Sequence, residues 1–265
     1  MEWLIAYLVL GAFVGFFAGL FGIGGGLVLV PVLSWMFEAQ QFSAQNNVHL
    51  ALGTAMAAIF FSAAYSARTH HAYGAVNLSV VTAMTPGLLI GTGMATFFAS
   101  RVAPVYLTLF FALFVYFAAA QMLFDLKPTP KRRLPGGWMM ALVGAGIGAI
   151  SSLVSIGGGT LSIPFLLRHN VSLPHAIGTS AALGLPIAVG GSIGYIVTGM
   201  WLDNLPRYSL GFVYLPAVVL LAAGSMLTTP LGAKATHHLP IKILRRCFAG
   251  LLLVLATRML LKAVY

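Results

Sequence analysis

Three successive glycines follow an isoleucine at two places in this chain, Ile23-Gly24-Gly25-Gly26 and Ile156-Gly157-Gly158-Gly159. A helix that restarts after such a run presents backbone N–H groups without an intrahelical acceptor, together with the positive end of its dipole. Successive glycines also permit the concave backbone nest that holds oxyanions. The glycines expected to bind the oxygen atoms of a small anion are Gly24, Gly25, Gly26, Gly157, Gly158 and Gly159.

Hydroxyl side chains near the glycine runs extend this set of donors. Ser155 and Thr160 flank the second run, and Ser151, Ser152 and Ser162 lie close by in the sequence. A further motif, Ala-[Leu/Ile]-Gly-Thr, ends at Thr54 and again at Thr179. The candidate hydroxyls for substrate binding are Thr54, Ser155, Thr160, Thr179 and Ser180.

Both sets of residues also have a structural interpretation. The glycine runs could be notches that let another helix approach closely. Thr54 and Thr179 could hydrogen-bond to carbonyl groups of their own helices. Because the glycine triplet recurs five residues before a proline in both places, we favour a binding role for it over packing alone.

Carboxylates are scarce and lie outside the apolar segments. The chain has four, all at segment ends or in loops: Glu2, Glu38, Asp125 and Asp203. Cation transporters hold their ion with carboxylates inside the membrane, so the pattern disfavours a cationic substrate. The net charge of +10 comes from 14 Lys and Arg in connecting segments, where basic residues mark the cytoplasmic side of a membrane protein. We therefore expect no nucleic-acid partner.

No catalytic or metal-binding pattern is evident in the sequence. A hydrolase would need Ser180 together with His169 or His175, but the segment Gly178-Thr179-Ser180-Ala181 lacks the final glycine of G-x-S-x-G. The H-E-x-x-H zinc motif is absent as well. We expect no catalytic residue, no metal and no cofactor.

The chain consists of two copies of one unit. Residues 11–33 and 144–166 align at an offset of 133 with ten of 23 positions identical, and such internal similarity decides how the fold is interpreted. We expect a first transmembrane repeat over residues 1–126, a basic cytoplasmic linker over 127–137 and a second transmembrane repeat over 138–265. Paired breaks at matching places in two halves are the best sequence indication of a transporter's binding site.

Composition places both repeats in a membrane. The sequence is 60% hydrophobic and 7% charged, with a mean hydropathy of +0.97, against about 25% charge in soluble domains. Several uncharged runs exceed the roughly 20 residues that a helix needs to cross a bilayer. The expected fold is an all-α polytopic membrane protein with two homologous repeats, each a glycine-broken helical hairpin plus three transmembrane helices.

The distribution of basic residues favours inverted repeats. If each glycine run interrupts a single crossing, the 14 basic residues divide 8 to 6 between the two sides. If each run forms a hairpin that returns to the side it entered, the division is 10 to 4, which satisfies the positive-inside rule better. The four on the outer side are then Arg101, Arg207, Arg258 and Lys262.

The repeated pattern G-x₃-G-x₇-I-G-G-G-x₄-P-x-L, with A-[LI]-G-T following, resembles the TauE/SafE family of sulfite exporters and related anion permeases. The resemblance covers nearly the whole chain. It implies a multi-pass permease of the bacterial cytoplasmic membrane that exports sulfite, an organosulfonate or another sulfur-containing anion. One departure is Ala55, where the second repeat has the more family-like Ser180.

The expected partners are a small anion and the lipid bilayer. The glycine-spaced faces at Gly11, Gly15 and Gly19 and at Gly144 and Gly148 suit either a homodimer or a contact between repeats. Another small anion, a neutral solute or a membrane scaffold without transport are the alternative functions. The sequence leaves open a proton-coupling role for His49 and His175 and whether Arg258 extends to the membrane surface.

Overall fold

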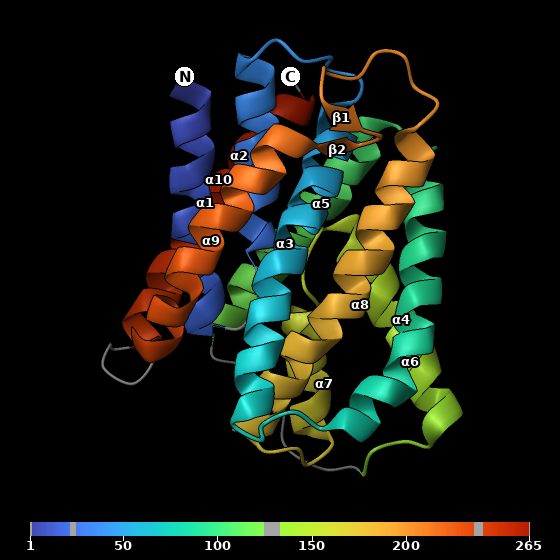
Figure 1. Ribbon diagram of the computed structural model, residues 1–265, viewed down its shortest axis with the longest axis vertical. Coiled ribbons are helices and arrows are strands. Elements are labelled where there is room, and N and C mark those ends of the chain that lie inside the picture. Colours follow the sequence, from blue (N-terminus) through green and yellow to red (C-terminus); the bar gives the residue numbers. More distant parts are fainter. Residues whose placement is uncertain (1, 22–24, 125–132, 236–240, 265) are drawn as a thin grey trace.

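The computed structural model describes residues 2–21, 25–124, 133–235 and 241–264 and, within these ranges, contains ten helices and one short β-hairpin (Figure 1). The first five helices come from the first half of the chain: α1 (Glu2–Phe21), α2 (Gly26–Ala39), α3 (Asn47–Ala72), α4 (Leu78–Ala99) and α5 (Pro104–Leu123). The second half adds α6 (Gly137–Leu153), α7 (Gly159–Arg168), α8 (Leu173–Gly199), β1 (Ser209–Leu210), β2 (Val213–Tyr214), α9 (Leu215–Ala235) and α10 (Ile241–Val264).

Within the described ranges, six helices are long and apolar enough to cross a membrane: α1, α3, α4, α5, α8 and the Leu215–Gly232 part of α9. Large apolar side chains on their outer surfaces are exposed, among them Ile5, Val9, Leu113 and Ile193. In a bilayer these side chains face lipid, whereas a soluble protein rarely exposes so much contiguous apolar surface. The expectation of an all-helical membrane protein is confirmed.

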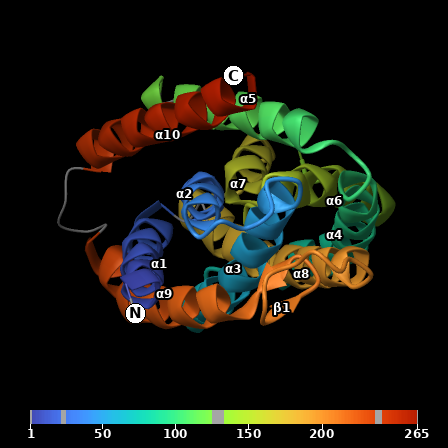
Figure 2. The same ribbon diagram turned by 90° about the horizontal axis from the view of Figure 1, so that it is seen from above.

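The short helices lie in the middle of the molecule. Seen along the bundle, α2, α3 and α7 are enclosed by a ring made of α1, α9, α8, α4, α6, α5 and α10 (Figure 2). α2 has 14 residues and α7 has 10, fewer than the roughly 20 needed to span the hydrocarbon core. Each of them therefore begins or ends inside the membrane, where only surrounding protein can satisfy its terminal N–H groups.

Glycines set the main contacts between the two halves of the chain. Gly11 of α1 lies against Leu221 of α9, and Gly15, one turn later, lies against Ser225, also one turn later, so the two helices run parallel. A Cβ added at either glycine would overlap the backbone of α9. The small-residue face of α1 therefore allows the close helix approach expected of it, and its partner is the fourth helix of the other half.

The same contact recurs between α6 and α4. A Cβ added at Gly144 would lie 2.6 Å from the carbonyl oxygen of Met84, and one at Gly148 would lie 2.5 Å from that of Leu88. The residue numbers of the contacting pairs again increase together along both helices, so α6 and α4 run parallel. In both halves, the first helix is thus packed against the fourth helix of the other half.

The chain reverses direction between α1 and α2. The side-chain amide of Gln40, at the end of α2, donates a 2.6 Å hydrogen bond to the hydroxyl of Tyr7, near the start of α1. Asn47 then donates from the start of α3 to the carbonyl of Ser34 in α2 at 3.0 Å. The last residue of α2 and both chain ends lie at one end of the molecule together with the β-hairpin, which we call the hairpin end (Figure 1).

α7 points the other way. It ends at the opposite end of the molecule, which we call the α7 end, beside the turn between α3 and α4 (Figure 1). Lys127, Lys131 and Arg132 of the expected linker lie outside the described residues, as do Asp125 before it and Gly24 of the first glycine run. The repeat and linker boundaries stay predictions.

Candidate functional site

The two glycine runs meet at the centre of the fold. A Cβ added at Gly26, the first residue of α2, would overlap the carbonyl oxygen of Ser155, which immediately precedes the second run. The hydroxyl of Ser155 donates a 2.7 Å hydrogen bond to the carbonyl of Leu52 in α3. Segments 129 residues apart are therefore in backbone contact, and α3 holds them in place.

Two left-handed residues lie at the second glycine run, one directly before it and one within it. Ser155 has φ 49° and Gly158 has φ 79°, in the region that costs a non-glycine residue about 1–2 kcal/mol. Gly158 is the N-cap residue of α7, and its carbonyl accepts hydrogen bonds from the N–H groups of Leu161 and Ser162. A left-handed residue next to a right-handed one, as Gly158 is next to the helical Gly159, turns successive N–H groups to one side, as an anion-binding nest requires.

The first glycine run is shaped differently. Gly25 is the N-cap residue of α2 with φ −76°, and its carbonyl accepts from the N–H groups of Val28 and Leu29. The space that a Cβ of Gly25 would need is occupied by the side chain of Val14 in α1. At this break an apolar side chain packs directly on the glycine.

Most hydroxyls around the second break are already hydrogen-bonded within the protein. Ser162 donates to the carbonyl of Gly158 at 2.8 Å, and Ser180 of α8 lies 2.7 Å from the Ser162 hydroxyl, so Ser180 is the donor in that pair. The hydroxyl of Ser152 donates to the carbonyl of Ala149 in its own helix. These bonds attach α7 to α8 and leave few hydroxyls free for a substrate.

Ser151 and Thr160 are the two exceptions near this break. Their side chains are 1% and 6% exposed, and neither hydroxyl has a hydrogen-bond partner in the part of the chain that the structure describes. Thr160 is the second residue of α7, and the Ser151 hydroxyl lies 3.9 Å from where a Cβ of Gly158 would be. Both therefore lie at the N-terminus of α7.

Thr54 and Thr179 hold loops from the opposite repeat. Thr54 accepts a 3.0 Å hydrogen bond from the N–H of Tyr214, and Thr179 accepts a 2.9 Å bond from the N–H of Asn77. Neither of the two sequence interpretations anticipated these bonds, which join residues 160 and 102 positions apart. The neighbouring glycines of the motif lie against the same loops, because a Cβ at Gly53 would overlap the carbonyl of Phe212.

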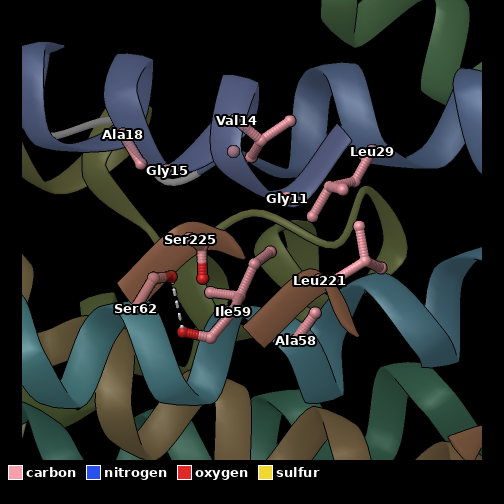
Figure 3. A pocket seen from close by; sticks show the side chains of 11 residues that line it. Gly11, Val14, Gly15, Ala18, Leu29, Ala58, Ile59, Ser62, Leu221 and Ser225 are labelled. Atoms are coloured by element: carbon pink, nitrogen blue, oxygen red, sulfur yellow. Dashed lines mark hydrogen bonds between the residues drawn. The ribbon is translucent and has the colours of Figure 1, made fainter. Parts of the chain in front are cut away.

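A pocket lies beside the first break (Figure 3). It is lined by Gly25 and Leu29 of α2 together with residues of α1, α3 and α9, and a second pocket continues around α3 to Gly157 of the second break. The two pockets share Ala18, Ile59 and Ser62. Both pockets lie along α3, and each includes a glycine of one break.

Four hydroxyls that line these pockets were not identified from the sequence: Ser62, Ser66, Ser225 and Thr229. Those of Ser62, Ser225 and Thr229 each donate to a carbonyl of their own helix, at 3.0, 3.0 and 2.6 Å. They belong to no repeated motif, so no sequence signal distinguished them from other serines and threonines in the spans.

Tyr195 donates a 3.1 Å hydrogen bond to the carbonyl of Ser152 near the second break, whereas the histidines and the arginine singled out from the sequence contact other parts of the fold. His49 is within 3.0 Å of the carbonyl oxygen of Ala99 and stacks on Phe212, and His175 is bonded to Ser172 at the start of α8. The Arg258 guanidinium lies over Trp35 at the hairpin end. The described residues contain no group of His, Cys, Asp or Glu that could hold a metal ion.

Comparison with known proteins identifies the family. The family model of the sulfite exporter TauE/SafE matches residues 7–259. The chain belongs to this family. A probable membrane transporter protein of Haemophilus influenzae is 36% identical over 263 residues, with 96% of this chain and 97% of that protein covered. The family resemblance stated from the glycine motif is therefore confirmed.

More distant relatives have the same description. A probable membrane transporter protein of Methanocaldococcus jannaschii is 25% identical, with 96% of this chain and 94% of that protein covered. One of Bacillus subtilis is 26% identical, with 91% and 96% covered. No solved structure matches the chain. The TauE/SafE family and these relatives are membrane transporters, which makes this chain a multi-pass membrane protein of a transporter family.

Proposed function

We propose that this TauE/SafE protein exports a small sulfur-containing anion, sulfite or an organosulfonate, across the bacterial cytoplasmic membrane through a central site at the two helix breaks. The observation that carries the proposal is the contact of Gly26 with Ser155, which brings the starts of α2 and α7 together inside the fold. Helix N-termini favour negative charge, and the absence of charged residues from 134–167 leaves no carboxylate there to repel an anion.

We further propose that the two repeats are inverted about an axis in the membrane plane. The directions of the helices support this, because α1 runs from the hairpin end whereas α6 runs toward it (Figure 1). In each of the parallel pairs α1–α9 and α6–α4, the first helix of one repeat lies against the fourth helix of the other. Inverted repeats with binding at their interface are an architecture that many secondary transporters share.

The charged residues support an orientation with the α7 end in the cytoplasm. Basic residues next to that end of the helices are Arg68, Arg133, Arg168, Arg245 and Arg246. The hairpin end has four basic residues and also the carboxylates of Glu2, Glu38 and Asp203, with Glu38 paired to Lys262. An excess of Lys and Arg marks the cytoplasmic side of a membrane protein.

Cysteine labelling tests both the inversion and the orientation. The only cysteine is Cys247, so a Cys247→Ser background can take Gln45→Cys after α2 or Ser172→Cys after α7, both at exposed positions. In intact cells we expect an impermeant maleimide to label Gln45→Cys but not Ser172→Cys, and to label both after the membrane is opened. Equal labelling of both positions in intact cells would exclude inverted repeats.

Flux in proteoliposomes tests the transport function and its location. We expect labelled sulfite to cross at a set membrane potential and pH gradient, with methanesulfonate competing. Gly25→Leu and Gly158→Leu should each remove at least about 90% of this flux, because the leucine side chain fills a break. A tenfold loss of rate corresponds to about 1.4 kcal/mol.

Gly146→Leu is the matched control for the flux experiment. Gly146 lies in α6, where an added Cβ has no atom within 4 Å, so the flux of this variant should remain. If both break variants are folded and transport at the wild-type rate, the site is elsewhere. If the folded wild type moves none of these anions, the sulfur-anion assignment is wrong, and small carboxylates and neutral solutes are the next substrates to test.

A further inference from the structure

The two breaks have the same glycines but different neighbours. At the offset of 133, Ser151 and Thr160 of the second repeat correspond to Ala18 and Leu27 of the first. Ser162 likewise corresponds to Leu29. These three residues of the second repeat bear hydroxyls, and all three counterparts in the first repeat are apolar. The two breaks therefore cannot offer a ligand the same contacts.

The buried hydroxyls of Ser151 and Thr160 indicate a polar ligand at the second break. A buried polar group without a partner costs about 1–3 kcal/mol, and most such groups in folded proteins are paired. Ser152, next to Ser151 and equally buried, has its hydroxyl bonded within its own helix. The two unpaired hydroxyls are therefore a local exception, and both adjoin the first turn of α7.

Backbone donors converge at the same place. No protein acceptor among the described residues receives a hydrogen bond from the N–H groups of residues 157–160. α7 has 10 residues, so its dipole adds a positive potential at these N–H groups. Gly158 is left-handed and is followed directly by the helical residue Gly159, and such a pair of opposite hand is the backbone conformation of an oxyanion-binding nest.

We propose that the substrate's oxyanion group is bound by the second repeat alone, by Ser151, Thr160 and the N–H groups of residues 157–160. The first break has apolar neighbours instead, with Leu27 in α2 and with Val14 packed on Gly25. The inference rests on the proposed function and names the part of the central site that recognises charge.

The charge of the substrate follows from the absence of cationic side chains. Segments 3–37, 39–67, 134–167 and 169–202, which build the two breaks, α3 and α8, contain no Lys or Arg. Neutral donors and one helix dipole compensate about half an elementary charge, and moving an ion out of water is costly unless it is paired. The subsite therefore accepts a singly charged R–SO₃⁻ group, as in a sulfonate or hydrogensulfite, and disfavours a dianion.

Calorimetric titration of the purified full-length protein with methanesulfonate tests this subsite. Ser151→Ala and Thr160→Val remove one hydroxyl each with little change in shape. A hydrogen bond to a charged group corresponds to about a tenfold to hundredfold change in affinity, so each variant should weaken binding by at least about tenfold. Thr160→Ser, which keeps the hydroxyl, should bind like the wild type.

Two kinds of control accompany these titrations. Ser152→Ala removes a neighbouring hydroxyl that is already bonded to Ala149 and should leave methanesulfonate binding unchanged. Methanesulfonamide, a neutral molecule of similar shape, and sulfate, a dianion, should both bind much more weakly than methanesulfonate.

The outcomes separate this inference from the proposed function. If methanesulfonate binds and sulfite is transported, but Ser151→Ala and Thr160→Val bind as tightly as the wild type, the one-sided subsite is wrong and the permease function stands. If sulfate binds as tightly as methanesulfonate, the selection for a single charge is wrong. If the folded wild type neither binds methanesulfonate nor transports sulfite, both proposals fail.

Discussion

Replacing Gly26 with alanine is expected to disrupt the centre of the protein and abolish transport. The added methyl group would overlap the carbonyl oxygen of Ser155 and would lie 3.1 Å from the Cδ1 of Ile59. Ser155 cannot move aside easily, because its hydroxyl is bonded to Leu52 in the buried part of α3. Overpacking of a tight core costs about 1–3 kcal/mol, and a backbone obstacle places Gly26→Ala at the upper end of that range. We expect a lower Tm in detergent and no sulfite flux in proteoliposomes.

Gly25→Ala provides the comparison, because the obstacle there is a side chain. Its methyl group would overlap Cγ1 of Val14, so the double variant Val14→Ala/Gly25→Ala should recover most of the Tm that Gly25→Ala loses. No truncation of a side chain should rescue Gly26→Ala in the same way. A Gly26→Ala protein with the Tm and flux of the wild type would show that the two breaks do not meet.

The sequence predicted where the helices are interrupted, but not what each interruption contacts. The glycine runs indicated breaks near residues 24–26 and 157–159, and α2 and α7 begin at Gly26 and Gly159. Glycine runs mark such positions because they lack the side chains that favour a continuous helix. The contact of Gly26 with Ser155 depends on the packing of distant segments, which local sequence does not encode.

For the hydroxyl donors, too, the sequence indicated their positions but not their hydrogen-bond partners. The sequence identified the hydroxyls around the second break, including Ser155, Thr160 and Ser180. It could not tell which of them are already bonded, because their acceptors come from elsewhere in the fold, as Leu52 does for Ser155. Thr54 and Thr179 show this most clearly, since each accepts from a loop of the opposite repeat. A repeated motif can therefore reflect contacts between repeats as well as contacts with a substrate.

The glycines of α4 are expected to show opposite effects two residues apart. A Cβ at Gly91 would overlap the carbonyl oxygen of Ala145 in α6, whereas one at Gly93 has no atom within 4 Å. Gly91→Ala should therefore destabilise the protein by about 1–3 kcal/mol through overpacking. Gly93→Ala should stabilise it by up to about 1 kcal/mol, because alanine has the higher helix propensity. Tm measurements in detergent on both variants test these opposite effects. Equal shifts of the same sign would contradict the parallel packing of α4 on α6.

The same contacts constrain how the repeats can move during transport. α1 is packed through Gly11 and Gly15 on α9, and α6 is packed through Gly144 and Gly148 on α4, so each repeat has its first helix fixed to the other. Backbone contacts this close do not allow sliding without separation of the helices. A motion that exposes the breaks to alternate sides must then keep the two parallel pairs intact and move the remaining helices against them. Gly91→Ala should accordingly reduce sulfite flux together with Tm, whereas Gly93→Ala should raise Tm and retain flux.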